Sequence, residues 1–420
     1  MASNSKIKNS LLYLSETLGQ IDINENEIKV VTIKKFIHIL EDVEDFRVKG
    51  RCSYKLENLI VMVFFAVLAG YGSNCIDMAD YVSLNKQMFI KWEMIEKDED
   101  TPSHDTFRRL LINLNTEKLK EIIYYYLNNF FERVEDTITH EKPYKQLSID
   151  GKELRGTGRS KQTRNPRGNL GTLNVYDNTR CLILFSDSIE KKDSEIIEAR
   201  DKLELLDLEK TIVTCDAIHC QKKTAELIHD KHGLYLLAAK NNQELLTKDI
   251  EERITSKKIK PIKTDTRDFY FYTLPKNFIG LEWAGQKMYV KVKTYTKKDE
   301  PTDLYFLSNS TNKQLIIEAV EKRWLIENDH HRNKDNLFDE DKFRIADKRA
   351  VENIVAINDI ALAFVRITFT FMPELKTLKK TRMAFKINPE KYLMILLSII
   401  SSDVIIDKLK ELSKKNKKKK

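Results

Sequence analysis

Apolar residues follow two different spacings along the chain, and the change between them predicts separate regions. Before about residue 140 they recur at helical spacing, in segments such as 54–70 and 116–135. The first of these segments ends at Gly70, a residue type that commonly terminates helices. We therefore predict an all-helical N-terminal domain over residues 1–140.

Short apolar runs bounded by turn residues replace the helical spacing after Lys145. The predicted strands cover residues 147–150, 172–176, 181–186, 211–215 and 234–239. Helical segments at 194–206 and 221–231 precede the fourth and the fifth of these strands. Three strands followed by alternating helices and strands form the element order of the ribonuclease-H-like fold. We predict an α/β protein with a ribonuclease-H-like mixed sheet and flanking helices over residues 141–240 and 311–375.

Residues 241–310 interrupt this predicted core. After a helix at about 243–254, the apolar runs 269–274, 287–295 and 304–309 predict strands, with lysines among them and turn signals between them. We interpret this segment as a β-rich insertion before the last catalytic helix. Residues 376–420 predict a basic helical C-terminal region with a tail that ends in KKNKKKK.

Composition, cysteine spacing and apolar run length indicate which partners and which location to expect. The chain has 420 residues, is 41% hydrophobic and carries a net charge of +8, which permits a nucleic-acid partner. Its five cysteines lack CxxC spacing, so we expect reduced thiols and neither a zinc site nor a disulfide framework. The longest apolar run, residues 59–71, is shorter than the ~20 residues that span a bilayer. With no signal peptide in MASNSKIKNS, we expect a cytoplasmic protein without a membrane partner.

The charged segment EKRWLIENDHHRNKDNLFDED, residues 321–341, holds the first candidate chemistry. On a regular helix Arg323, Glu327, His330 and Lys334 fall within roughly 60° of one another. A solvated helix face is the simpler interpretation of such charges. The bulky apolar run WLI beside Glu327 instead indicates a packed segment.

Two upstream acids could meet Glu327 in space. Asp150 ends the apolar run LSID and Asp216 ends the run TIVTCD. Open α/β sheets place their chemistry where strands end. Three converging carboxylates can hold a pair of Mg²⁺ ions, which prefer oxygen ligands and promote in-line attack on a phosphodiester. We predict that these three acids are the catalytic and metal-binding residues.

Cationic and amide side chains near these acids are candidate DNA contacts. A basic loop begins directly after Asp150, the KxNQ segment ends a predicted core strand, and the helix of Glu327 adds further cations. The predicted DNA-binding residues are Lys152, Arg155, Arg159, Arg164, Lys240, Asn242, Gln243, Arg323, His330 and Lys334.

Four motifs occur in an order that resembles a known family. They are IDGKELRG, DAIHCQ, KNNQ and WLIEN, within a resemblance that extends from about residue 46 to 370. The sequence resembles the H-repeat-associated transposases of bacterial insertion sequences, a branch of the DDE transposases. The resemblance implies a ribonuclease-H-like core with Asp150, Asp216 and Glu327 as its metal triad. It also implies cleavage of transposon ends and their joining to target DNA, with two Mg²⁺ ions for which Mn²⁺ can substitute.

The same resemblance implies the partners and the location. The partner is double-stranded DNA, both the terminal inverted repeats and the target, bound by a homodimer because two ends are cut together. A bacterial, nucleoid-associated location follows. By hypothesis, the helical domain recognises the ends, with Arg108 and Arg109 as candidates.

Three departures from the family pattern leave the handling of a flipped or hairpin strand open, and two alternatives to a transposase stand beside the main interpretation. Val320 stands where related hairpin-forming transposases have a tyrosine, Arg332 where the family usually has an aromatic residue, and Ile218 replaces the methionine of a DAM motif. One alternative is a structure-selective nuclease on the same fold. The other is a catalytically decayed DNA-binding protein.

Overall fold

The computed structural model describes residues 31–138, 144–154, 157, 170–189, 192–280, 282–295, 301–340 and 347–401. By their contacts these residues form two compact units. The first contains the described residues within 143–152 and 171–329, and the second contains those within 9–142, 153–170 and 330–420.

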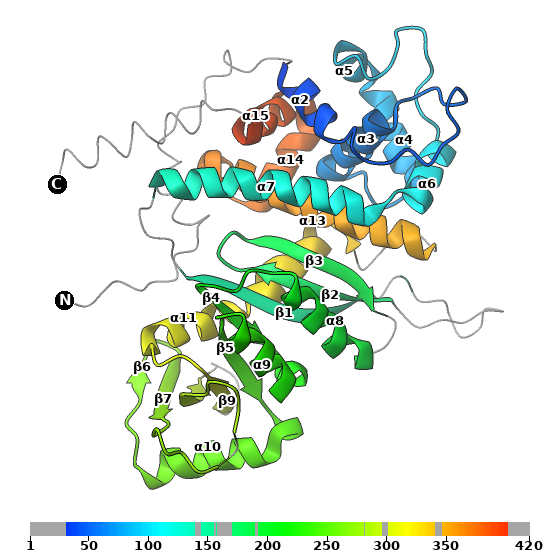
Figure 1. The fold of residues 1–420 in the computed structure, drawn as a ribbon. Helices are drawn as coiled ribbons and strands as arrows, with labels where there is room; N and C mark the ends of the chain where they lie inside the picture. The colour runs from blue at the N-terminus through cyan, green and yellow to red at the C-terminus, as the bar shows by residue number, and fades with distance from the viewer. Residues whose placement is uncertain are drawn as a thin grey trace, which may run out of the picture. The chain divides into compact units, whose positions relative to one another are not determined.

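The first unit is built on one nine-stranded sheet (Figure 1). Its strand order is β3-β2-β1-β4-β5-β9-β8-β7-β6. The strands are β1 (Lys145–Leu154), β2 (Leu170–Asp177), β3 (Leu182–Ile189), β4 (Thr211–Cys215), β5 (Leu234–Ala239), β6 (Ile262–Lys263), β7 (Arg267–Thr273), β8 (Met288–Thr294) and β9 (Thr302–Ser308). β1, β4 and β5 run parallel, whereas β2 and β3 form an antiparallel hairpin. The predicted ribonuclease-H-like mixed sheet is confirmed.

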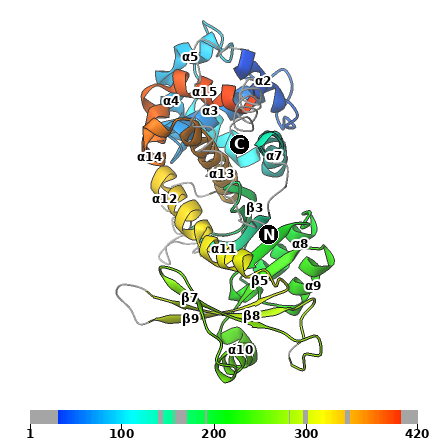
Figure 2. The same cartoon turned by 90° about the vertical axis from the view of Figure 1, so that its left-hand side faces the viewer.

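Helices cover both faces of this sheet because its strands alternate apolar residues between the faces. One face packs against α8 (Lys192–Glu204), α9 (Lys222–Asp230) and α10 (Glu244–Ser256). The other packs against α11 (Lys313–Arg323). In β4, Ile212 faces α11 while Val213 faces the opposite layer. Figure 2 shows α10 and α11 on opposite sides of β7, β8 and β9. The sheet is therefore packed between two apolar layers, which hold the strands and their ends in place.

The segment predicted as a β-rich insertion extends the same sheet. β9 pairs antiparallel with β5, and β8 and β7 follow in antiparallel order. Leu237 of β5 pairs with Leu307 of β9, so the sheet continues without a break from core to insertion. The boundaries of residues 241–310 as a separate domain stay a prediction.

The helix after α11 is not regular. α11 ends at Arg323 and is followed by a π-helical segment, η5 (Ile326–His331), and then by α12 (Arg332–Phe338). A π-helical turn holds more residues than an α-helical turn, so it rotates the side chains that follow it. The regular spacing assumed from the sequence therefore does not hold beyond Glu327.

The second unit is helical, which confirms the predicted N-terminal helical region. Its helices are α2 (Val31–Ile39), α3 (Leu56–Ala69), α4 (Cys75–Leu84), α5 (Lys86–Lys91), α6 (His104–Asn113), α7 (Thr116–Ile138), α12, α13 (Lys348–Phe371), α14 (Leu378–Ile387) and α15 (Pro389–Ser401). The predicted cap is also observed: Gly70 takes a φ of 90° after α3. α13 is long and apolar enough to cross a membrane, but 94% of its most apolar window is buried in the protein. It is the core helix of this unit.

Candidate functional site

The three acids predicted from the sequence line one small cavity in the first unit. Ile149 of β1 pairs with Cys215 of the parallel strand β4, so the residues that follow, Asp150 and Asp216, lie side by side. Glu327 enters the same cavity from η5. The cavity measures about 50 Å³. That is room for one or two small ions or water molecules, since a water occupies ~30 Å³ in the liquid.

Asp216 is held by two cations. Lys240 Nζ lies 3.1 Å from Asp216 Oδ1, and Arg323 Nη1 lies 3.7 Å from the same oxygen. Burial alone would raise the pKa of Asp216, but the Ala217 backbone N–H, Lys240 and Arg323 together hold that pKa below its usual value. Asp216 is therefore a stable carboxylate at neutral pH.

Asp150 has the opposite electrostatic environment. Burial raises the pKa of Asp150 to about 7, and the negative charges of Glu327, Asp216 and Glu195 add to the effect. Two neighbouring acids with pKa values pushed apart are typical of functional sites. A cation placed among these carboxylates would relieve their mutual repulsion.

Arg323 is a buried cation beside the acids. It is 8% exposed, and its guanidinium carbon lies 4.5 Å from the centre of the Trp324 ring. Burial lowers the pKa of Arg323, while the charges of Asp216, Glu327 and Asp150 act in the other direction. Stacking on an aromatic ring fixes the plane of the guanidinium fork, which suits it to bidentate contact with a phosphate.

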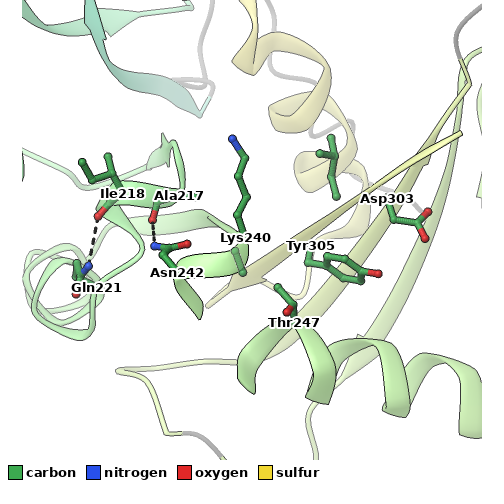
Figure 3. Close-up of a pocket in the computed structure, with 10 residues that line it drawn as sticks. Ala217, Ile218, Gln221, Lys240, Asn242, Thr247, Asp303 and Tyr305 are labelled. Carbon is green, nitrogen blue, oxygen red and sulfur yellow. Dashed lines mark hydrogen bonds between the residues drawn. The ribbon is translucent and has the colours of Figure 1, made fainter. Parts of the chain in front are cut away.

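An open groove of about 590 Å³ adjoins the small cavity, and Lys240 lines both. Figure 3 shows Lys240 standing between Asn242 on one side and Tyr305 on the other. The Asn242 side-chain amide donates to the Ala217 carbonyl at 2.6 Å, and that of Gln243 donates to the Cys220 carbonyl at 2.9 Å. Both amides therefore brace the turn that follows Asp216.

Of the predicted DNA contacts in and near the basic loop, one lies on β1 and three fall outside the described residues. Lys152 is half-buried on β1, two residues beyond Asp150 and so on the same face of the strand. Arg155, Arg159 and Arg164 of the basic loop fall outside the described residues.

The regular helix assumed for His330 and Lys334 in the sequence pattern is interrupted by the π-helical segment η5. The π-helical turn of η5 redirects them into the core of the second unit, where each is 1% exposed. Lys334 Nζ lies 2.7 Å from Asp359 Oδ1 and 3.0 Å from Glu340 Oε1, and His330 Nε2 lies 3.1 Å from Asp359 Oδ1. In this structure both residues belong to a buried charge cluster, and their role as DNA contacts stays a prediction.

This cluster predicts a pH dependence of stability. Burial lowers the pKa of His330 to about 4, against the attraction of Asp359. The unfolded chain would protonate this histidine near its ordinary pKa of ~6.5. Between pH 6.5 and 4 the unfolded state therefore binds more protons, so the free energy of unfolding falls as the pH falls, by roughly 2–4 kcal/mol. The carboxylate of Asp359, whose pKa is lowered, loses its contribution only at still lower pH.

Denaturant unfolding at several pH values measures this effect. His330→Asn should lower the slope of the unfolding free energy against pH, between pH 4 and 6.5, by the amount that corresponds to about one proton. Thr368→Val, a substitution at a buried, non-titrating residue of α13, is the control and should leave the slope unchanged. Equal slopes for the wild type and His330→Asn would contradict the buried neutral histidine.

The donor chemistry of the cavity fits a hard divalent cation. Its acidic side chains offer oxygen ligands, and its volume suits ions better than an organic cofactor. Within the described part of the chain, no three His, Cys, Asp or Glu side chains already converge closely enough to hold an ion. Asp216 instead contacts Lys240, so an ion that binds Asp216 Oδ1 would replace that ammonium.

One acidic neighbour of the cavity has no sequence pattern that marks it as a candidate. Glu195 of α8 is 8% exposed and is among the charges that raise the pKa of Asp150. Nothing in its local spacing separates it from the other acids of α8, because its position depends on how the helix packs against the sheet.

Comparisons with known proteins show which family the chain belongs to. The family model described as "Transposase DDE domain" matches residues 141–364, and the model described as "DDE_Tnp_1-associated" matches residues 37–127. The chain is 25% identical to "Putative transposase YncI" of Escherichia coli O157:H7, over 80% of this chain and 88% of that protein. It is 24% identical to "H repeat-associated putative transposase YhhI" of Escherichia coli K12, over 79% and 90%.

A solved structure gives a weaker likeness. The piggyBac transposase in its synaptic complex with hairpin DNA matches at a TM-score of 0.40 and 11% identity, over 97% of this chain and 84% of that chain. The resemblance to H-repeat-associated transposases seen in the sequence is confirmed by the named relatives. Because the transposase DDE domain model covers more than half of the chain, the chain belongs to the DDE transposase family, a family of DNA-acting enzymes that use divalent metal ions.

Proposed function

We propose that this protein is the transposase of a bacterial insertion sequence, which cuts the element's ends and joins them to target DNA. The observation that carries the proposal is the register of β1 and β4, which sets Asp150 beside Asp216 at the edge of the cavity that Glu327 also lines. Double-stranded DNA, both the terminal inverted repeats and the target, is the proposed substrate. Because two ends are cut together, we propose a homodimer on DNA, acting at the bacterial nucleoid in the cytoplasm.

Asp150, Asp216 and Glu327 are the proposed metal-binding and catalytic residues. The ions are two Mg²⁺, for which Mn²⁺ can substitute. When bound, they would activate the attacking oxygen and stabilise the leaving oxygen of a phosphodiester. The raised pKa of Asp150 supports this assignment. Burial and the neighbouring carboxylates oppose ionisation of Asp150, and a bound cation would offset that unfavourable free energy.

Cations around the acids would bind the DNA backbone. Arg323 is fixed against Trp324 and can present its planar fork to a phosphate beside Asp216. Lys240 is half-exposed at the mouth of the cavity and can move from Asp216 to a phosphate once the carboxylate has another counter-ion. The basic loop with Arg155, Arg159 and Arg164 is proposed to extend this backbone contact.

Strand cleavage in Mg²⁺ tests the proposal. The full-length protein is given a linear fragment that carries the element's terminal repeats, the same fragment with scrambled ends, and a branched junction without repeats. We expect cuts at the repeats alone and joined products when a plasmid target is added, with Ca²⁺ and chelator as negative controls. Cleavage of the junction in place of the repeats would indicate a structure-selective nuclease. Binding of the repeats without cleavage in Mg²⁺ or Mn²⁺ would indicate a DNA-binding protein.

Lys240→Met gives a sharper test of the backbone contact. Removing one phosphate contact should lower the slope of log affinity against log salt by about 1, with little change in sequence preference. The control is Lys248→Met, because Lys248 is an exposed lysine of α10 whose ammonium lies 2.6 Å from Glu244. Binding titrations with end DNA at several salt concentrations measure both slopes. If the two variants give equal slopes, Lys240 is not a phosphate contact.

A further inference from the structure

A fourth carboxylate lies against the backbone next to Asp150. Glu195 of α8 is 8% exposed, and it packs on Gly151, the residue that follows Asp150 in β1. A Cβ added to Gly151 would meet Glu195 Oε1 at 3.1 Å and both Cδ and Oε2 at 3.2 Å. The whole carboxylate therefore rests on the face of this glycine, and a side chain at residue 151 would force it to shift by a few tenths of an ångström.

His219 holds this carboxylate in place. His219 Nε2 lies 3.2 Å from Glu195 Oε1, and the histidine is 1% exposed. It belongs to the short helix η3 (Ala217–His219) that directly follows Asp216. The pair therefore links α8, the backbone beside Asp150 and the turn after Asp216. Among the described residues, no group is placed to bond the other ring nitrogen of His219, Nδ1.

A buried carboxylate at this position has an energetic consequence for the site. Four acids, Glu195 with Asp150, Asp216 and Glu327, concentrate negative charge in a region of low dielectric, and each additional charge strengthens the attraction for a cation. A carboxylate needed solely to pack α8 against the sheet could be replaced by an apolar or amide group, because burying a charge is costly.

We propose that Glu195, fixed by His219 and Gly151, is a positioning residue that strengthens divalent-cation binding at the site of Asp150. The inference rests on the proposed metal-binding role of Asp150, Asp216 and Glu327, and it adds a fourth carboxylate that acts from behind Asp150. Groups in the shell around metal ligands typically change metal affinity 10–100-fold when they are replaced, and we expect the Glu195 charge to act within this range.

Binding of Mn²⁺ to the full-length protein without DNA tests this inference, measured by the loss of the free-ion paramagnetic resonance signal. Glu195→Gln keeps the size of the side chain and can still accept a hydrogen bond from His219, but it removes the charge. We expect it to weaken Mn²⁺ binding about 10–100-fold. Glu198→Gln, three residues further along α8, is the matched control and should bind Mn²⁺ like the wild type.

A second variant separates charge placement from folding. Gly151→Ala keeps all four acids but crowds the Glu195 carboxylate, which must shift by a few tenths of an ångström, so it should weaken Mn²⁺ binding less than Glu195→Gln does. Thermal unfolding without metal is measured for each variant. Lower thermal stability of Glu195→Gln with unchanged Mn²⁺ affinity would show a structural role and overturn the inference.

Asp150→Asn distinguishes this inference from the function on which it rests. If Asp150→Asn loses Mn²⁺ binding while Glu195→Gln retains it, the inference on Glu195 alone is wrong. If Asp150→Asn retains it, or if the wild type binds no Mn²⁺, the metal centre itself is wrong and the inference is overturned with it. Weakening by both substitutions, with Glu198→Gln unchanged, supports both.

Discussion

Asp150→Asn is expected to reduce strand cleavage at the element's ends by roughly 10²–10³-fold, comparable to the loss of a principal electrostatic group in other active sites. The substitution keeps the shape of the side chain but removes one of the carboxylates that line the cavity. The fold should survive, because Asp150 is buried beside other negative charges that raise its pKa. At neutral pH and without metal, the neutral amide should therefore be at least as stable as the acid.

Asp216→Asn and Glu327→Gln should show the same loss of cleavage, because each removes another of the carboxylates that line the same cavity. Asp201→Asn, a change at an exposed acid of α8, is the control and should cleave like the wild type. End-labelled DNA carrying the terminal repeats gives the rate for every variant, and thermal unfolding shows whether each is folded. Wild-type rates for any of the three folded cavity variants would remove that residue from the catalytic set.

The strands of the sheet can be predicted from the sequence where turn residues bound them. Residues 211–215 and 234–239 were predicted with the bounds of β4 and β5, because buried parallel strands are short continuous apolar runs. β1 was predicted to end at Asp150 but extends to Leu154, since its polar second half is stabilised by a neighbouring strand. Pairing of that kind depends on residues far away in the chain and leaves no local pattern.

The candidate site, like the sheet, can be predicted only in part from the sequence. Asp150 and Asp216 could be placed together because parallel strands end at one edge of a sheet. The positions of His330 and Lys334 could not, because the π-helical turn in η5 breaks the regular period on which the helical-face argument depends. The structure supplies a partner for both in Asp359, in the middle of the mostly apolar helix α13. A distant helix that packs against them is invisible to local spacing.

Lys334→Met is expected to lower the free energy of unfolding by about 3–5 kcal/mol, as removal of one partner of a buried ion pair does. Lys334 and Asp359 have side chains that are 1% and 0% exposed, and Glu340 is also fully buried. Burial alone would lower the pKa of Lys334, but Asp359 and Glu340 raise it, so the lysine is charged in the folded protein. The substitution would leave two buried carboxylates without their ammonium.

A double variant shows whether the loss comes from the unpaired charge. Lys334→Met with Asp359→Asn should recover part of the stability that Lys334→Met loses, because the amide carries no charge that needs a cation. Lys348→Met, at the exposed start of α13, breaks a surface pair with Glu352 and should cost no more than about 1 kcal/mol. Urea unfolding followed by circular dichroism measures all three variants. If Lys334→Met costs no more than Lys348→Met, the ammonium of Lys334 reaches solvent, where it is available for the DNA contact that the sequence pattern predicted.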